Sequence, residues 1–203
     1  MKTYFITGIG TDVGKTIAAT LIVQALKADY WKPIQAGDLE ASDTLKVKSL
    51  IANKITKFHP ETYQLNHAMS PHAAAERDRV HIDISNFDIP KTNNHLVIEG
   101  AGGLLVPLNR QNTLLDLIEQ LNTEVILVSK HYLGSINHTL MSAALLQQRK
   151  IKVKGILFNG LENKETESII KEMTGLEILG RIAPIESLNK TSVAAHALKL
   201  KNI

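Results

Sequence analysis

Apolar and polar positions alternate in blocks along this chain. Short, nearly continuous apolar runs occur at "TYFIT", "HLVIEGAGG", "EVILVS", "KVKGILFN" and "LEILGRI". Such runs are typical of strands that are buried on both faces of a parallel sheet. The segments between them carry apolar residues at helical spacing, which predicts helices over 14–27, 43–52, 113–121, 135–149 and 164–173 and a last helix from Ser187 onward.

This alternation predicts an α/β fold, with a mostly parallel sheet and helices on both of its faces. The 203 residues suit a single domain spanning 1–203. "YWKPI" is predicted as one short extended piece, because residues before Pro33 avoid the helical region, and Ser42 as the N-cap of the helix that follows. Residues 54–93 have a mixed pattern with a weak helix near 73–77, and we expect them to supply loops over a binding site.

Composition excludes several kinds of site. The chain has no cysteine, so disulfides and thiolate chemistry are excluded. The net charge of +3 comes without any run of five like charges, which argues against a nucleic-acid partner. No apolar stretch reaches the roughly 18 residues of a membrane span, and the start "MKTYFITGIG" does not resemble a secretory signal. We expect a soluble, cytoplasmic protein with no membrane partner.

The first predicted strand runs into "GIGTDVGKT", which has the ending of a phosphate-binding loop. The usual spacing is Gly, four residues, then Gly-Lys-Ser/Thr, whereas five residues separate Gly8 from Gly14. Strand, Gly-Lys-Thr and helix together favour a variant loop over an ordinary glycine turn. In such a loop Lys15 reaches the outer phosphates and Thr16 offers its hydroxyl to Mg²⁺.

Other charged residues follow other predicted strands, whose carboxyl ends share one edge of the sheet. Glu99 is predicted to end the strand "HLVIE", which then runs into the glycine loop "GAGG", and Asp43 opens a helix. With Thr16 these residues could hold Mg²⁺, which prefers hard oxygen ligands. A solvated strand end is the alternative for Glu99, and simple helix capping is the alternative for Asp43. Lys32 either extends out to solvent or points into the site, where a second lysine would stabilise developing phosphoryl charge.

In their order along the chain, "TGIGTDVGKT", "WKPIQAG", "SDTLKV", "SPHAAA", "VIEGAGGLLVPL", "LGSINHTL" and "FNGLE" resemble the dethiobiotin synthetase family. The resemblance implies a P-loop NTPase-like fold and an ATP-dependent ligase of biotin synthesis. The implied substrates are 7,8-diaminononanoate, CO₂ or bicarbonate, and ATP with Mg²⁺. The implied reaction would pass through a carbamate and a carbamic–phosphoric anhydride to the cyclic urea of dethiobiotin, with release of ADP and phosphate. The resemblance also implies a homodimer with substrate at its interface.

The resemblance further implies roles for residues of the matching motifs. Lys32 and Lys15 would be catalytic, and the metal ligands would be Thr16, Asp43 and Glu99. Nucleotide contacts would come from Thr11, Asp12, Val13, Gly14, Lys15, Thr16, Asp43, Glu99, Gly100, Ala101, Gly102 and Asn159. Substrate contacts would come from Lys32, Ser70, Pro71, Gly134, Ser135 and Asn137.

Two positions depart from the family pattern. Ala36 stands where a hydroxyl residue is common, so Gln35 or a water would have to replace that hydroxyl. Gly160 follows Asn159 where Asp is common, which leaves nucleotide selectivity open. Two other functions are alternatives to the ligase. A switch ATPase of the partitioning and septum-placing kind would start its loop with Lys-Gly-Gly, whereas this loop starts Thr7-Gly8-Ile9, and a metabolite kinase would leave "LGSINH" without a purpose.

Overall fold

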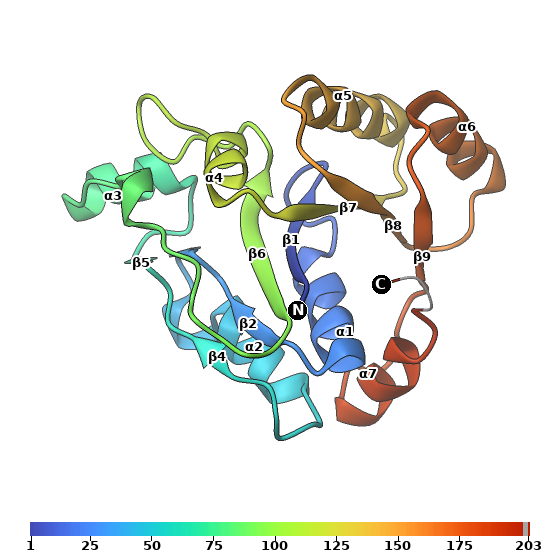
Figure 1. The fold of residues 1–203 in the computed structure, drawn as a ribbon, viewed down its shortest axis with the longest axis horizontal. Coiled ribbons are helices and arrows are strands. Elements are labelled where there is room, and N and C mark those ends of the chain that lie inside the picture. Colours follow the sequence, from blue (N-terminus) through green and yellow to red (C-terminus); the bar gives the residue numbers. More distant parts are fainter. Residues whose placement is uncertain (201–202) are drawn as a thin grey trace.

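A seven-stranded, entirely parallel sheet runs through the molecule (Figure 1). The computed structural model describes residues 1–200 and 203. In spatial order the strands are β4 (Phe58–His59), β2 (Asp29–Trp31), β6 (Leu96–Gly103), β1 (Thr3–Gly8), β7 (Glu124–Lys130), β8 (Val153–Asn159) and β9 (Ile178–Ile182). The predicted fold class is confirmed. The central position of β1, between β6 and β7, places the loop that follows it at the ligand-binding edge expected of such sheets.

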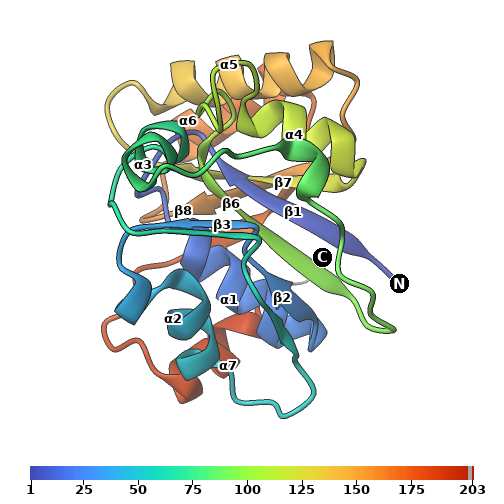
Figure 2. The same ribbon diagram turned by 90° about the vertical axis from the view of Figure 1, so that its left-hand side faces the viewer.

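Helices cover both faces of the sheet, as Figure 2 shows. One face carries α1 (Lys15–Leu26), α2 (Asp43–Leu50) and α7 (Lys190–Ala197), whose apolar sides share a core with Ile6 and Val97. The other face carries α3 (Pro71–Asp78), α4 (Leu114–Leu121), α5 (Ser135–Gln148) and α6 (Lys164–Thr174). The predicted helices are confirmed to within a few residues at their ends; residues 201–202 of the predicted last helix lie outside the described residues.

The segment "YWKPI", predicted as one short extended piece, belongs to two separate strands. Pro33 has no backbone N–H, so it cannot continue the ladder of β2. Its carbonyl instead accepts the amides of Thr62 and Tyr63, at 2.9 and 3.1 Å. The chain then forms β3 (Ile34–Ala36), which pairs in parallel with β5 (Tyr63–Leu65) in a separate two-stranded sheet.

The mixed segment 54–93 holds more regular structure than its pattern predicted. It contributes β4 to the edge of the main sheet, β5 to the small sheet, and α3 at the position of the weak predicted helix. Two short 3₁₀ turns complete the described elements, Leu39–Ala41 and Ile84–Asn86. β4 and β5 are too short for a period-two pattern to reveal them.

The glycines after Glu99 belong to β6 rather than to a loop, which corrects the prediction that the strand ends at Glu99. The strand continues to Gly103, which pairs with Gly8 of β1 after an irregularity in the register. A Cβ atom at Gly100 would lie 2.7 Å from a ring carbon of Phe5. The missing side chains therefore let this strand pass close against β1 and the helix layer. Because the strand continues past Glu99, this residue lies within β6 and not at its end.

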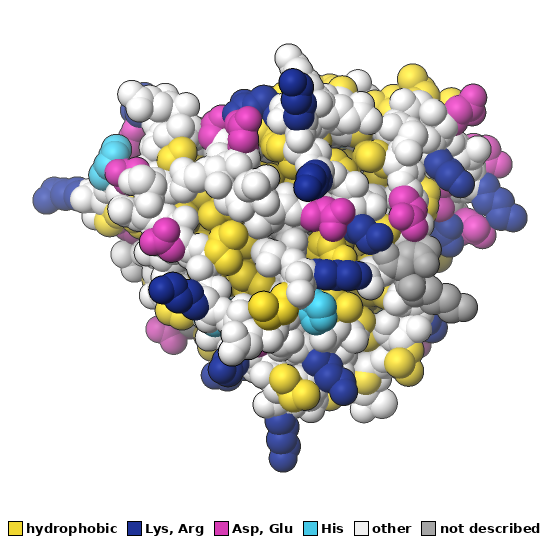
Figure 3. Space-filling model, in the orientation of Figure 1, with side chains coloured by type: hydrophobic (Ala, Val, Ile, Leu, Met, Phe, Trp, Pro, Cys, Tyr) yellow, Lys and Arg dark blue, Asp and Glu magenta, His cyan; other side chains and the backbone are white. Residues whose placement is uncertain are grey.

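The described residues contain no helix long and apolar enough to cross a membrane. On the face drawn in Figure 3, lysine and arginine side chains stand apart from one another, with acidic side chains between them.

Candidate active site

The loop between β1 and α1 contains two residues with left-handed backbone conformations. Gly14 has φ 95° and caps α1, and Asp12 also has a left-handed backbone at φ 56°. A Cβ atom at Gly14 would collide with the side-chain amide of Asn159. That amide donates to the Val13 carbonyl at 2.9 Å, so the end of β8 fastens the loop from outside. Glycine is required at position 14 for both reasons.

Lys15 begins α1 and folds back over the loop. Its Nζ donates to the Gly10 carbonyl at 2.8 Å, and the side chain is almost fully buried. Burial lowers the pKa of Lys15 to about 8, against a partial opposing effect of the Glu99 charge. The ammonium and the amino end of α1 together create a positively charged cradle suited to phosphate.

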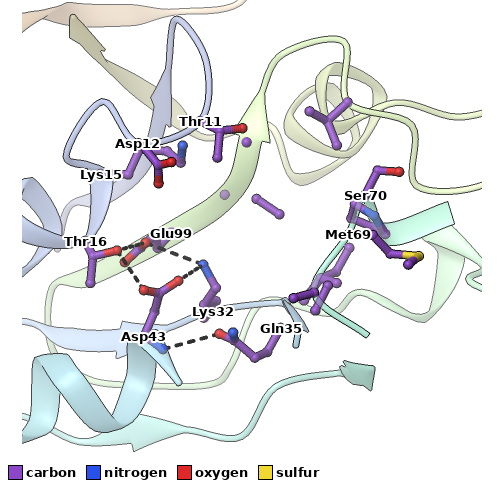
Figure 4. A pocket seen from close by; sticks show the side chains of 18 of the residues that line it. Thr11, Asp12, Lys15, Thr16, Lys32, Gln35, Asp43, Met69, Ser70 and Glu99 are labelled. Carbon is purple, nitrogen blue, oxygen red and sulfur yellow. Dashed lines mark hydrogen bonds and ion pairs between the residues drawn. The ribbon is translucent and has the colours of Figure 1, made fainter. Parts of the chain in front are cut away.

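Three oxygen-bearing side chains from three elements meet beside this cradle (Figure 4). Thr16 Oγ1 lies 2.9 Å from Asp43 Oδ1 and 2.7 Å from Glu99 Oε1. A hydroxyl has one hydrogen to donate, so it cannot satisfy both carboxylates at once. Thr16 comes from α1, Asp43 from α2 and Glu99 from β6, and the predicted convergence of these residues is present.

Lys32 points into the site rather than out to solvent, which decides the alternative left open by the sequence. Only 4% of the residue is exposed, and its Nζ lies 2.6 Å from Asp43 Oδ2 and 3.4 Å from Glu99 Oε1. Burial acts to lower the pKa of Lys32, but the charges of Glu99 and Asp43 outweigh it and raise the pKa above its usual value. Lys32 is therefore a protonated ammonium buried at the cavity wall.

Asp43 is held in place from its own backbone. The Ser42 side chain accepts the Leu45 amide at 3.3 Å, which confirms Ser42 as the N-cap of α2. Gln35 Oε1 accepts the Asp43 amide at 3.3 Å, while its Nε2 donates to the Gly37 carbonyl at 2.9 Å. Burial acts to raise the pKa of Asp43, but Lys32 and Thr16 lower it overall. Gln35 therefore orders this turn, and it also lines the cavity with a second Nε2 hydrogen left to donate.

Tyr30 is a site residue that the sequence did not reveal. Its hydroxyl donates to Glu99 Oε2 at 2.8 Å inside the protein. Burial, followed by the charge of Glu99, raises the pKa of Tyr30 well above its usual value, so the hydroxyl stays protonated. The contact depends on β2 lying beside β6, with Tyr30 opposite Val97. Strand order of this kind is not readable from one sequence.

A cavity of about 660 Å³ opens in front of these groups. Its walls include the predicted residues Thr11, Asp12, Gly14, Lys15, Thr16, Lys32, Asp43, Ser70, Pro71, Glu99, Gly100, Ala101 and Gly102. Ala68 to Pro71, from the mixed segment, form the wall opposite the phosphate loop, as expected of that segment. Unpredicted wall residues such as Ile34, Met69 and Val106 are apolar, and sequence pattern does not separate them from core residues.

Five predicted site residues do not line this cavity. Val13 is buried beneath the loop, and Asn159 is bonded to its carbonyl. The other three, Gly134, Ser135 and Asn137, lie at the amino end of α5. The structure therefore brings the phosphate-loop and carboxylate residues together within one chain, and it leaves the α5 residues outside that site.

The surface between the phosphate loop and α5 is apolar and hollowed. A second cavity of about 380 Å³ lies there, and its walls include Gly10, Leu105, His138 and Met141. Leu105 and Met141 are more than half exposed, and Leu133, just before α5, is fully exposed. Large apolar side chains gathered on one surface are typical of a protein contact.

The oxygen set fits Mg²⁺ as a bound nucleotide would present it. The described residues contain no group of three or more His, Cys, Asp or Glu side chains able to hold a metal without help. Two carboxylates and a hydroxyl, with phosphate oxygens and waters, supply the hard ligands and open positions that Mg²⁺ prefers. Thr16 has one hydroxyl hydrogen for two carboxylate oxygens, so one of these oxygens lacks a hydrogen from Thr16. A cation bound between the three side chains would satisfy it.

A glycine-wrapped loop after the central strand, with Lys15 folded over it, defines a P-loop nucleotide-binding protein. Residues 2–192 match a family model described as an AAA domain. The chain is 51% identical to an ATP-dependent dethiobiotin synthetase of Cytophaga hutchinsonii, with 98% of this chain and 97% of the relative covered. It is 52% identical to a protein of the same name from Christiangramia forsetii, with 98% and 96% covered. The chain belongs to the ATP-dependent dethiobiotin synthetase family.

Solved structures with a similar fold have distant sequences. The septum site-determining protein MinD of Pyrococcus horikoshii, solved with Mg-ADP, has a TM-score of 0.60 at 14% identity, with 98% of this chain and 88% of that chain covered. A ParA family ATPase of Chlorobium tepidum has a TM-score of 0.55 at 14% identity, with 98% of both chains covered. At this identity the likeness concerns the fold alone, so it supports the P-loop architecture and not a switch function.

Proposed function

We propose that this protein closes the ureido ring of dethiobiotin from 7,8-diaminononanoate, CO₂ and ATP, and releases ADP and phosphate. One substrate amine reacts with CO₂ to give a carbamate, and a carbamate oxygen attacks the γ-phosphate. The resulting carbamic–phosphoric anhydride is attacked by the second amine, which closes the urea and expels phosphate. The observation that carries this proposal is the buried Lys32 ammonium at the wall of the same cavity as the phosphate loop.

The side chains at this cavity suit a reaction driven by positioning and charge stabilisation. Negative charge is spread over the carbamate and the transferring phosphoryl group, and Lys15 and Lys32 approach the cavity from different elements. Lys32 is drawn into the protein by Asp43 and Glu99 at 2.6 and 3.4 Å, so its charge is fixed near the reacting atoms before substrate arrives. Fixed charges of this kind lower a barrier without reorganising at the moment of reaction.

Thr16, Asp43 and Glu99 would hold Mg²⁺ together with the nucleotide. A bound Mg²⁺ neutralises phosphate charge and helps to align the γ-phosphate. The chain's own contribution is to hold the Thr16 hydroxyl of α1 within hydrogen-bond distance of carboxylate oxygens from α2 and β6. The nucleotide phosphates would take the backbone amides of the loop from Thr11 to Thr16.

Asn159 would read the adenine edge with the free atoms of its amide. Its Nδ2 already donates one hydrogen to the Val13 carbonyl, which fixes the amide plane and leaves Oδ1 and the second hydrogen available. Gly160, the next residue, has φ 124° and open space around an ideal Cβ position. The glycine strand from Gly100 to Gly102 would let ligand approach the backbone closely.

The α5 residues fit the proposal if the protein is a homodimer. Gly134, Ser135 and Asn137 lie outside the chain's own cavity, beside the exposed Leu133 and Met141. Joining two copies through this apolar surface would bring the amino end of α5 toward the partner's cavity. There the helix end would receive the substrate's carboxylate, while Ser70 and Pro71 would contact the diamine.

Phosphate release tests the function directly. With the full chain, release is expected to require the diamine, bicarbonate and Mg²⁺-ATP together, and mass spectrometry should detect dethiobiotin in equal amount. Omitting each component in turn supplies the controls. Equal ATP hydrolysis with and without the diamine would contradict the ligase and favour the switch ATPase.

A further inference from the structure

The two oxygens of Glu99 have different partners. Oε1 faces the site and accepts from Thr16 at 2.7 Å and from Lys32 at 3.4 Å. Oε2 faces away from it and accepts from the Tyr30 hydroxyl at 2.8 Å. A carboxylate can rotate about its last torsion, since that sp³–sp² torsion is broad. The Tyr30 hydrogen bond restricts this rotation and holds the plane of the carboxylate so that one oxygen points toward the site.

Tyr30 itself is tightly held, which is what a positioning residue needs. It is fully buried, it lies in the middle of β2, and its ring centroid is 5.9 Å from that of Phe58 on the edge strand β4. On its other side β2 pairs with β6, where Tyr30 lies opposite Val97. The hydroxyl is thus fixed by two neighbouring strands, and it does not line the cavity.

We propose that Tyr30 is a positioning residue for the metal site, which acts by holding Glu99 so that only Oε1 faces the cation. A single oxygen suits the near-octahedral geometry of Mg²⁺ better than a two-oxygen contact, which demands a narrow angle. Hydrogen bonds that orient metal ligands in this way commonly change metal affinity 10- to 100-fold when removed. The inference rests on the metal site of the proposed function and adds a residue from outside it.

The test measures how strongly metal and nucleotide binding are coupled. The dissociation constant of ADP is determined by calorimetry in EDTA and again at saturating Mn²⁺, for the wild type and for Tyr30→Phe. The ratio of the ADP dissociation constant in EDTA to that in Mn²⁺ is expected to be about tenfold smaller in Tyr30→Phe than in the wild type. The dissociation constant in EDTA should stay within about twofold of the wild-type value. A purely structural role for Tyr30 would lower thermal stability and leave this ratio unchanged.

Two further variants make the result specific. Tyr63→Phe removes a tyrosine hydroxyl that lies away from the cavity, where it accepts hydrogen bonds from Asp83 and Asn86. The ratio of dissociation constants in this variant should equal the wild-type ratio. In a Glu99→Gln background, Tyr30→Phe should cause no further loss, because the effect passes through Glu99. An unchanged ratio in folded Tyr30→Phe, or an equal loss in Tyr63→Phe, overturns the role of Tyr30. A wild-type ratio near one overturns the metal site itself.

Should Tyr30→Phe be recovered unfolded, the wild type still answers the question. The chain has four tyrosines, so 3-fluorotyrosine labelling gives four ¹⁹F signals. Tyr4→Phe, Tyr63→Phe and Tyr132→Phe assign three of them, and the fourth is Tyr30. Adding Mg²⁺ to the ADP-saturated protein should shift the Tyr30 signal more than that of Tyr63. A Tyr30 signal that does not respond overturns the proposal.

Discussion

Two buried carboxylates on neighbouring strands are stabilised in opposite ways. Asp29 begins β2 and Glu99 lies in β6, and each is only 1% exposed. In the register of the two strands Asp29 is opposite Leu96, the first residue of β6, so the two carboxylates sit toward opposite ends of the sheet. One lies at the amino end, where parallel sheets rarely bind ligands, and the other at the carboxyl end, where they usually do.

Asp29 is surrounded by donors that belong to the fold. It accepts the Lys57 amide at 2.9 Å, the Thr92 hydroxyl at 2.6 Å, the Asn94 amide at 3.2 Å and His59 Nε2 at 3.3 Å. Burial acts to raise the pKa of Asp29, but these hydrogen bonds, Thr92 first, lower it overall. The charge is satisfied in place, and it ties β2, β4 and the turn before β6 together.

On the cavity side, Glu99 Oε1 and Asp43 are bound by groups that substrate and metal would engage under the proposed function, while Glu99 Oε2 is held by the buried Tyr30 hydroxyl. Their partners Lys32 and Thr16 both line the cavity. A ligand can exchange these partners without breaking a strand or a helix. The difference suggests a rule that variants can test: a buried carboxylate whose donors all belong to the fold contributes to stability, whereas one that shares a cavity-lining cation contributes to the proposed reaction.

The largest effect should follow from removing that cation. Lys32→Ala should lower turnover by at least about 100-fold, because it removes the ammonium that Asp43 and Glu99 hold at the cavity wall. ATP should still bind, since the phosphate loop is intact. Single-turnover phosphate release and nucleotide calorimetry separate the two steps.

Lys48→Ala serves as the matched control, because Lys48 is exposed on the same helix that Asp43 begins. It removes an equal charge and should keep wild-type turnover. Unchanged turnover in Lys32→Ala would show that the shared cation of the comparison is structural after all.

A smaller effect, on stability alone, should follow at the other carboxylate. Asp29→Asn replaces one of the two acceptor oxygens with an NH₂ group, which would face the donors that surround Asp29. The change should lower the free energy of unfolding by about 1–3 kcal/mol. Turnover per folded molecule should stay the same. Urea unfolding measures the first quantity, and Asp88→Asn, at an exposed position, is the control. A loss of turnover without a loss of stability would reverse the assignment of the two carboxylates.

Local pattern predicted the elements whose cause is local. The apolar runs that became β1, β7 and β8 are buried on both faces, and the Gly-Lys-Thr ending fixed the start of α1. Lys15, Thr16, Asp43 and Glu99 could be placed together because parallel strands share one carboxyl edge.

What the pattern missed depends on contacts between distant segments. Tyr30 reaches Glu99 only because β2 lies beside β6, and β4 is two residues long. Lys32 could equally have turned outward, and the choice is made by two carboxylates from other elements. The continuation of β6 through its glycines required the close approach of Phe5, which no window of the sequence contains.

The pH dependence of stability gives the finest test of the comparison. The pKa of Asp29 in the folded protein is lowered below the ordinary value of 3.8. Its contribution to stability is therefore fully present above 3.8 and is lost as the pH falls through the folded value. The difference in unfolding free energy between wild type and Asp29→Asn should stay constant from pH 7 to 5. It should then narrow toward pH 3.5, by at most about 1.4 kcal/mol per pH unit.

The difference between the two proteins isolates Asp29, because Asp43, whose pKa is also lowered, is common to both. His59 is an ionisable partner of Asp29, so the same pair is compared again in a His59→Gln background. If the difference in unfolding free energy still narrows in the His59→Gln background, the narrowing is due to Asp29 and its neutral donors. A gap that stays constant below pH 4 in both backgrounds would mean that those donors do not favour the charged form. The claim that the fold stabilises the charge of Asp29 through its hydrogen-bond donors would then be wrong.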